Sequence, residues 1–375
     1  MSDVLNELQA THTRQNPVYV IGYPRSGTSL ICRLLRRYLK VSFGTESQFI
    51  VRYHRRLRRY GDLNDDANVR RLIKDLSAER FFARSQQNWG FVFDPGRALA
   101  AVDERSYSGV LRAIFQQLAE HNGMVRWGDK TPEYNNHLPL LRSLFPDAQF
   151  VHIARDGRDV ALSIRKIHFG PKNAFETASQ WADSIRKIRA FAAEMPPDRF
   201  FEVRYEDLIR QPADTLAVVA DFLGIDDRSG SLRDYVRHHI GSEVEADNFG
   251  KWREWLSPRD VERFEAVAGT ELAQFGYELV FGDAARPVSA AERLCWSLHG
   301  GTWRLLLLGH WADNWYKLGL RARALGPNLI RRTGTTPRVA RGRGARACQI
   351  FSWARARSSA HSVKSSHWPR DRMSR

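Results

Sequence analysis

The segment Gly22-Tyr-Pro-Arg-Ser-Gly-Thr-Ser29 carries residue types suited to holding an anion. Its glycines have the spacing of a phosphate-binding loop, in which backbone N–H groups point towards one spot at the start of a helix. Arg25 adds a planar, permanent charge that matches phosphate or sulfate oxygens, and Ser26, Thr28 and Ser29 add hydroxyl donors. Thr28 stands where nucleoside triphosphatases have the lysine that contacts the β- and γ-phosphates. The loop therefore predicts an anion site that requires no Mg²⁺.

A second basic motif, Arg155-Asp-Gly-Arg-Asp159, follows an apolar run at residues 148–154. Ser163 lies eight residues after Arg155, and a turn followed by the start of a helix can bring its hydroxyl back towards the strand end. The strand ends in an arginine where P-loop nucleoside triphosphatases have a magnesium-binding acid. The motif indicates a second anion site, and a surface cluster of ion pairs is the alternative interpretation.

The heptapeptide from Tyr23 to Ser29 resembles the 5′-phosphosulfate loop of sulfotransferases that use 3′-phosphoadenosine 5′-phosphosulfate (PAPS). The segment from Arg155 to Ser163 is similar to the 3′-phosphate motif of the same family. This resemblance implies that residues 25–29, including Gly27, contact the phosphosulfate, and that Arg155 and Ser163 hold the 3′-phosphate. Two anion sites at adjacent strand ends of one parallel sheet are what a nucleotide with two phosphate groups requires.

Two later segments extend the resemblance over most of residues 17–280. Arg204-Tyr-Glu-Asp-Leu208 resembles a strand end of tyrosylprotein-type members, which implies that Tyr205 lies near the nucleotide. Gly250-Lys-Trp-Arg253 resembles a late segment whose lysine contacts a cofactor phosphate, which implies that role for Lys251. The loop lysine and the catalytic histidine motif of cytosolic arylsulfotransferases are absent, so the chain is most similar to bacterial and tyrosylprotein-type enzymes.

Sulfuryl transfer requires a base for the acceptor hydroxyl or amine, cations at the leaving oxygen, and rigid placement. The resemblance implies that Glu46, 21 residues after Arg25, is the general base and that Arg25 is the leaving-group cation. Lys130, in the context Asp-Lys-Thr-Pro, is implied as a stabiliser of the transition state. Without the resemblance, a glutamate after a short strand is more often a solvated carboxylate than a catalytic base. His152, inside an apolar strand, and Asp129 are weaker candidates for the base.

Short apolar runs alternate with helical patterns along the chain, which predicts an α/β fold: a P-loop-like, mostly parallel sheet with helices on both faces. Neighbouring parallel strands would then place Glu46 at the same sheet edge as the loop. We expect a helical insertion at about residues 47–121, a helix at about residues 134–144, and a helix that begins at Ser257-Pro258 with serine as its N-cap. The expected catalytic domain covers residues 1–282. The strands are predicted at residues 17–21, 41–43, 124–130, 148–154 and 200–205.

The formal net charge of +16 is concentrated at the C-terminus, because residues 331–375 hold twelve Lys or Arg and one acid. We expect a helical extension at residues 283–330 and a basic, disordered tail at 331–375. Residues 296–375 could contact a membrane surface or a polyanion without nucleic-acid specificity, although a helical hairpin packed on the catalytic domain is favoured. The N-terminus lacks an apolar signal segment and the cysteines are scattered, which predicts a cytoplasmic protein without a metal site. A membrane-peripheral location is the alternative.

The sequence thus predicts a metal-independent, PAPS-dependent sulfotransferase. A P-loop nucleotide kinase or nucleoside triphosphatase is the main alternative, and a polyanion- or membrane-binding protein is a second one. The acceptor class stays open among carbohydrate, lipid, small aromatic and peptidyl tyrosine, and the sequence does not indicate the oligomeric state.

Overall fold

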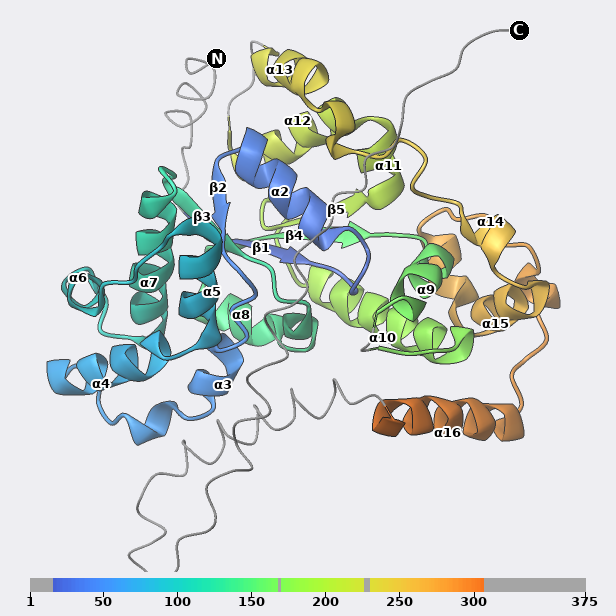
Figure 1. The fold of residues 1–375 in the computed structure, drawn as a ribbon, viewed down its shortest axis with the longest axis horizontal. Coiled ribbons are helices and arrows are strands. Elements are labelled where there is room, and N and C mark those ends of the chain that lie inside the picture. The colour runs from blue at the N-terminus through green and yellow to red at the C-terminus, as the bar shows by residue number, and fades with distance from the viewer. Residues whose placement is uncertain (1–15, 168–169, 226–229, 307–375) are drawn as a thin grey trace, which may run out of the picture. The chain divides into compact units, whose positions relative to one another are not determined.

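Five parallel strands form the centre of the protein, in the spatial order β2-β3-β1-β4-β5 (Figure 1). The computed structural model describes residues 16–167, 170–225 and 230–306, all of which belong to one compact unit, Met1–Asn314. The predicted α/β fold with a parallel sheet is confirmed. The strands are β1 (Val18–Ile21), β2 (Val41–Phe43), β3 (Arg126–Asp129), β4 (Gln149–Ala154) and β5 (Phe200–Arg204).

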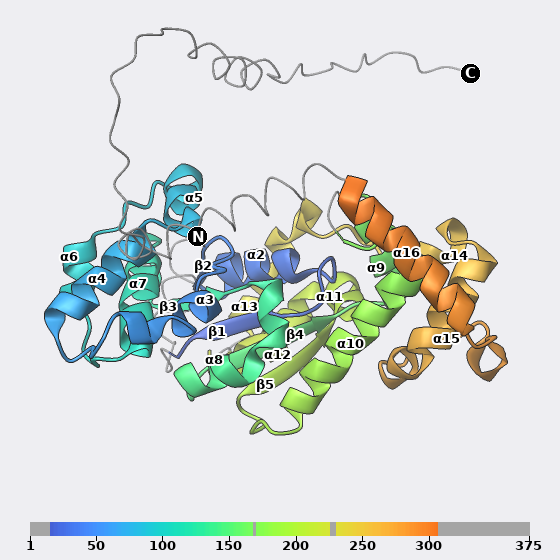
Figure 2. The ribbon, with the colours of Figure 1, turned by 90° about the horizontal axis from the view of Figure 1, so that it is seen from below.

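Side chains of the central strand β1 alternate between two hydrophobic cores, as a strand covered on both faces requires. Val18 and Val20 pack in the core that also contains α2 (Thr28–Tyr38), α12 (Pro212–Leu223) and α13 (Ser231–His239). Tyr19 and Ile21 pack in the opposite core with α7 (Tyr107–His121), α8 (Leu138–Leu144) and the C-terminal part of α10 (Ala174–Ala192). Figure 2 shows α2 and α10 on opposite sides of the sheet.

The predicted insertion at residues 47–121 is helical, and aromatic side chains hold it together. Phe49, Phe81 and Phe115 lie with ring centroids between 5.6 and 6.0 Å apart, and Phe115 stacks on Trp127 of β3 at 4.7 Å. The insertion therefore packs on the β2–β3 side of the sheet. Its helices are α3 (Ile50–His54), η1 (Leu57–Arg59), α4 (Asp66–Ser77), α5 (Arg80–Trp89), α6 (Pro95–Ala100) and α7.

Helices after β4 cover the other end of the sheet. α9 (Gly157–Arg165) follows β4 directly, and α10 packs along α15 (Pro258–Gln274). The predicted helical extension begins with α16 (Ala290–Leu306), and its remainder lies outside the described residues, as does the basic tail. The remaining elements are η2 (Pro132–Asn136), α11 (Tyr205–Arg210), η3 (Gly241–Glu243), α14 (Trp252–Trp255) and η4 (Gly282–Ala284).

Two predicted elements differ from those observed by more than one residue at an end. The expected helix at residues 134–144 is divided at His137 into η2 and α8, because Pro139 disfavours helical geometry at the residues before it and begins a new first turn. The strand expected at 124–130 is shorter and covers only Arg126–Asp129. Among the described residues, no helix is long and apolar enough to cross a membrane.

The serine at the N-cap of α15 allows a test of how much this cap stabilises the protein. The Ser257 side chain accepts a hydrogen bond from the backbone N–H of Asp260 at 3.2 Å, as predicted. We expect Ser257→Ala to lower the free energy of unfolding by about 1 kcal/mol in urea denaturation, because one N–H at the helix start loses its partner. Ser297→Ala, at an exposed position inside α16, serves as the control. Equal stability of the two variants would show that this cap contributes nothing.

Candidate functional site

The glycine-rich loop leaves β1 at Gly22 and joins α2 at Thr28 through a left-handed backbone. Arg25 has a φ of 73° and Gly27 a φ of 97°, a region that is strained for residues with a side chain. A Cβ atom on Gly27 would lie 2.4 Å from Cδ2 of the Tyr205 ring, so only glycine fits there. No acidic residue occupies the first turn of α2. The loop therefore presents a helix N-terminus and the exposed Arg25 side chain to an anion.

Arg155 lies at the end of β4 with its guanidinium directed at this loop. Its Nη1 donates to the carbonyl oxygen of Arg25 at 3.4 Å, and its Nη2 donates to the carbonyl oxygen of Asn248 at 2.7 Å. The guanidinium also stacks on the Tyr205 ring, 4.4 Å from the centroid. Although Arg155 is only 7 % exposed, its Nε has no hydrogen-bond partner among the described residues. Such a buried, unpaired donor fits a site completed by an anion.

Ser163 links the two motifs. Arg25 Nε donates to Ser163 Oγ at 2.9 Å, so the loop and the last turn of α9 are in direct contact. Asn248 connects the remaining candidates, because its side chain donates to the Tyr205 hydroxyl at 3.0 Å and accepts from Lys251 Nζ at 3.0 Å. Asn248 was not predicted as a site residue, because it lies in an irregular segment without a pattern of its own.

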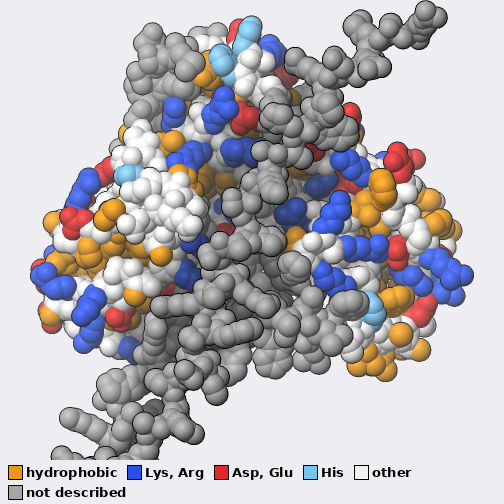
Figure 3. All heavy atoms as spheres, in the orientation of Figure 1, with side chains coloured by type: hydrophobic (Ala, Val, Ile, Leu, Met, Phe, Trp, Pro, Cys, Tyr) orange, Lys and Arg blue, Asp and Glu red, His pale blue; other side chains and the backbone are white. Residues whose placement is uncertain are grey.

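A cavity of about 960 Å³ joins these residues and is large enough for a nucleotide. Cations outnumber acids around it, with Arg33, Arg165 and Lys166 added to the predicted arginines and lysine, against Asp159, Glu243 and Glu245. Figure 3 shows Lys and Arg side chains gathered between α2 and α9. Ser26 is buried and does not line the cavity. The predicted cofactor residues that do line it are Arg25, Gly27, Thr28, Ser29, Arg155, Ser163, Tyr205 and Lys251.

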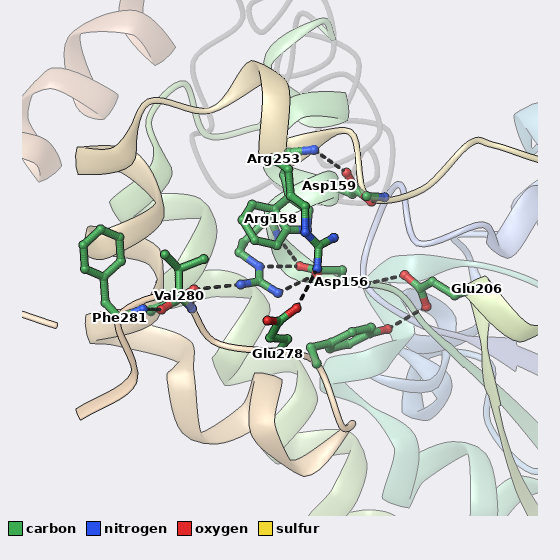
Figure 4. A network of polar contacts seen from close by, with 12 residues as sticks. Asp156, Arg158, Asp159, Glu206, Arg253, Glu278, Val280 and Phe281 are labelled. Carbon is green, nitrogen blue, oxygen red and sulfur yellow. Dashed lines mark hydrogen bonds and ion pairs between the residues drawn. The ribbon is translucent and has the colours of Figure 1, made fainter. Parts of the chain in front are cut away.

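Behind the cavity, the charged residues after Arg155 form a buried network (Figure 4). Arg158 donates to both Asp156 oxygens, at 3.0 and 2.8 Å, and to Glu265 at 2.7 Å. Asp159 accepts the N–H groups of Gly250 at 2.6 Å and Trp252 at 2.9 Å, which places Lys251 between them. The 155–159 motif therefore directs one arginine to the cavity, and its other charges bind α15 and residues 250–252 to the start of α9.

Glu46 and Lys130 lie together at the same edge of the sheet but do not line this cavity. Lys130 Nζ donates to Glu46 Oε1 at 2.7 Å, and the two side chains are 17 % and 34 % exposed, respectively. They follow β3 and β2, and β3 separates β2 from the loop strand β1. The strand that precedes Lys130 therefore lies between the strand that precedes Glu46 and the strand that precedes the loop.

The two weaker candidates for the base are fully buried. His152 Nδ1 lies 3.0 Å from Glu202, in the interior of the sheet. Asp129 accepts from Ser47 Oγ at 2.6 Å, and burial raises the pKa of this carboxyl from 3.8 to about 6 although Ser47 and Lys130 favour its charged form. Both side chains are thus shielded from an acceptor.

The family model described as "Sulfotransferase family" matches residues 17–229, which is more than half of the chain. The protein therefore belongs to the sulfotransferase family. A solved structure similar to it is the sulfotransferase domain of the Synechococcus PCC 7002 olefin synthase, with a TM-score of 0.45 and 22 % identity over 72 % of this chain and 98 % of that chain.

Two curated relatives carry more particular names. A putative protein-tyrosine sulfotransferase of Caenorhabditis elegans is 29 % identical over 38 % of this chain and 59 % of its own length. An omega-hydroxy-beta-dihydromenaquinone-9 sulfotransferase of Mycobacterium tuberculosis is 31 % identical over 29 % of this chain and 32 % of its own length. The chain spans between about a quarter and three fifths of the length of the first curated relatives that it matches.

The raised pKa of Asp129 predicts a pH-dependent contribution to stability. The folded protein binds this proton more tightly than the unfolded chain, so the contribution is complete below about pH 3.8 and is lost as the pH rises through about 6. In Asp129→Asn, which cannot titrate, the free energy of unfolding should improve relative to wild type by about 2 to 3 kcal/mol between pH 4 and pH 7.5. Urea denaturation across this range measures the difference, and a difference independent of pH would contradict the assignment.

Proposed function

We propose that this protein transfers the sulfuryl group of PAPS to a hydroxyl or amine acceptor. One observation carries the proposal: the glycine-rich loop, Arg155 and Ser163 line a single cavity, and Arg155 Nη1 lies 3.4 Å from the Arg25 carbonyl oxygen. One nucleotide with a phosphate on each side of its ribose can therefore contact both motifs. Membership of the sulfotransferase family supports the same donor.

The residues present fit this donor. Arg155 offers an unpaired, buried Nε to the 3′-phosphate, and Ser163 offers a hydroxyl beside it. The backbone N–H groups at the start of α2 and the Arg25 side chain would hold the phosphosulfate. Tyr205 and Lys251 would complete the nucleotide site. PAPS supplies an activated sulfuryl group when bound.

Glu46 acts as the general base in this proposal. It accepts the proton of the acceptor while the acceptor oxygen or nitrogen forms a bond to sulfur and the bond from sulfur to the bridging oxygen breaks. The bridging oxygen leaves on 3′,5′-adenosine bisphosphate, where Arg25 stabilises its charge. Lys130 donates a hydrogen bond to Glu46 at 2.7 Å and adds positive charge on this side of the site. These groups supply the base and the charges, so the proposed mechanism uses no metal ion.

A screen of acceptor classes tests the proposed activity and identifies the acceptor. The names of the relatives include a protein-tyrosine enzyme and a menaquinone-lipid enzyme, so peptidyl tyrosine and a lipid hydroxyl are both candidates. A screen with ³⁵S-labelled PAPS should cover carbohydrate, lipid, small aromatic and tyrosine-peptide acceptors. If no label is transferred to any of these acceptors and no sulfate is released to water, the proposed activity is contradicted.

Nucleotide binding distinguishes this proposal from a nucleoside triphosphatase. We expect 3′,5′-adenosine bisphosphate to bind with equal affinity in Mg²⁺ and in EDTA. Arg155→Ala should weaken that binding by about 10- to 100-fold in isothermal titration calorimetry, because a charged hydrogen-bond donor is lost. Arg84→Ala, an exposed position on α5, is the matched control and should bind as wild type does. Hydrolysis of Mg·ATP without binding of the bisphosphate would overturn the proposal.

Glu46→Gln tests the base separately from binding. The affinity for 3′,5′-adenosine bisphosphate should stay near that of wild type, since Glu46 does not line the nucleotide cavity. The turnover number for labelled sulfate transfer should fall by roughly 10²- to 10⁴-fold, as expected for a lost general base. Unchanged turnover would remove Glu46 from the mechanism.

A further inference from the structure

The residues that flank Glu46 and Lys130 in the sequence are hydrogen-bonded to each other in the interior. Ser47, immediately after Glu46, donates its hydroxyl to Asp129 at 2.6 Å and its backbone N–H to Thr131 Oγ1 at 3.1 Å. Asp129 and Thr131 are the two neighbours of Lys130. All three flanking residues are at most 3 % exposed. The Glu46–Lys130 ion pair at the surface therefore lies above a buried connection between the same two chain segments.

The buried bonds form a directed chain of donors. Ser47 donates its only hydroxyl proton to Asp129, so the bond of 2.9 Å between Tyr134 and Ser47 Oγ is donated by the Tyr134 O–H. The Tyr134 oxygen accepts the Ile50 N–H at 3.0 Å. Ser47 in turn donates to Asp129, the acceptor at the end of the chain. Thr131 Oγ1 lies 3.4 Å from both Asp129 carboxylate oxygens and also donates to this carboxylate. Each donor strengthens the next one in a medium of low dielectric constant, and we call Ser47, Asp129, Thr131 and Tyr134 the Ser47 network.

The backbone after Ser47 is strained, which indicates that the surroundings impose its conformation. Gln48 has a φ of 55°, in the left-handed region that residues with a side chain rarely adopt. From that conformation its Nε2 donates to Glu46 Oε2 at 3.3 Å, while Lys130 donates to the other oxygen of the same carboxylate. Both oxygens of Glu46 are thereby oriented by groups on either side of Ser47.

We propose that Ser47 is a positioning residue that holds Glu46 and Lys130 in register for sulfuryl transfer through its bonds to Asp129 and Thr131. The inference rests on the proposed function, because it assigns Ser47 an effect on turnover through Glu46. Ser47 itself is buried and does not line the nucleotide cavity. A displacement of about 1 Å in a catalytic group can cost up to 10²-fold in rate, so loss of the network should reduce turnover without affecting nucleotide binding.

Ser47→Ala removes the central donor and acceptor of the network. We expect the rate constant of labelled sulfate transfer to fall by about 10- to 100-fold, while the dissociation constant of 3′,5′-adenosine bisphosphate and the KM of PAPS change by less than about 3-fold. The acceptor is the best one found by the screen, or water if the screen finds none. Ser85→Ala is the matched control, since Ser85 is a fully buried serine of α5 whose hydroxyl has no hydrogen-bond partner among the described residues. Its rate should equal that of wild type.

A double-variant cycle separates positioning from general damage. In the Glu46→Gln background, Ser47→Ala should lower the remaining rate by less than about 3-fold, because residues that act as a unit are non-additive. An equal loss in both backgrounds, or no loss in the single variant, would overturn the inference. If Ser47→Ala does not fold, Tyr134→Phe, which removes the outer hydroxyl of the network and leaves the bond from Ser47 to Asp129 in place, should show a smaller loss with the same separation of rate from binding. Absence of transfer by the wild-type protein would instead contradict the proposed function itself.

Discussion

The parallel pairing of β1 with β4 is the constraint on which the site depends. Residues Val18 to Ile21 pair in register with Gln149 to His152, so the polypeptide leaves both strands at the same edge of the sheet. The approach is so close that a Cβ atom on Gly22 would lie 2.6 Å from the carbonyl oxygen of Ile153. The glycine-rich loop and Arg155 therefore emerge side by side, and a single cavity can contain both anion-binding elements. A shift of this register would separate them whatever their individual residues.

At this edge of the sheet, a buried arginine and an arginine that lines the cavity have different partners. Arg158, which is 1 % exposed, is stable in the interior because Asp156 and Glu265 both accept its N–H groups and Trp252 lies beneath it, 3.7 Å from the ring centroid. Within the part of the chain that the structure describes, Arg155, three residues earlier, donates hydrogen bonds only to backbone oxygens and stacks on an aromatic ring. The same motif thus neutralises one arginine inside the protein and leaves the other with excess positive charge for an anion.

Local patterns predicted much of this arrangement. The β1–loop–α2 unit follows from an apolar run, two spaced glycines and helical periodicity, and the serine and proline that begin α15 define its start. The division of the helix at His137 was not predicted, although Pro139 contains the signal. Asn248 was missed for a different reason: it lies in irregular chain, and it contacts Arg155, Tyr205 and Lys251 only because distant segments converge on it.

The sequence by itself determined the parallel α/β architecture and the two anion-binding motifs, because strand periodicity, glycine spacing and arginine chemistry act over a few residues. Only the tertiary structure decided which of these groups share one cavity, that β3 lies between the strands of Glu46 and the loop, and that Ser47 connects the neighbours of Lys130. Those relations join residues 82 or more positions apart, and they arise from strand order and burial, which no local pattern encodes.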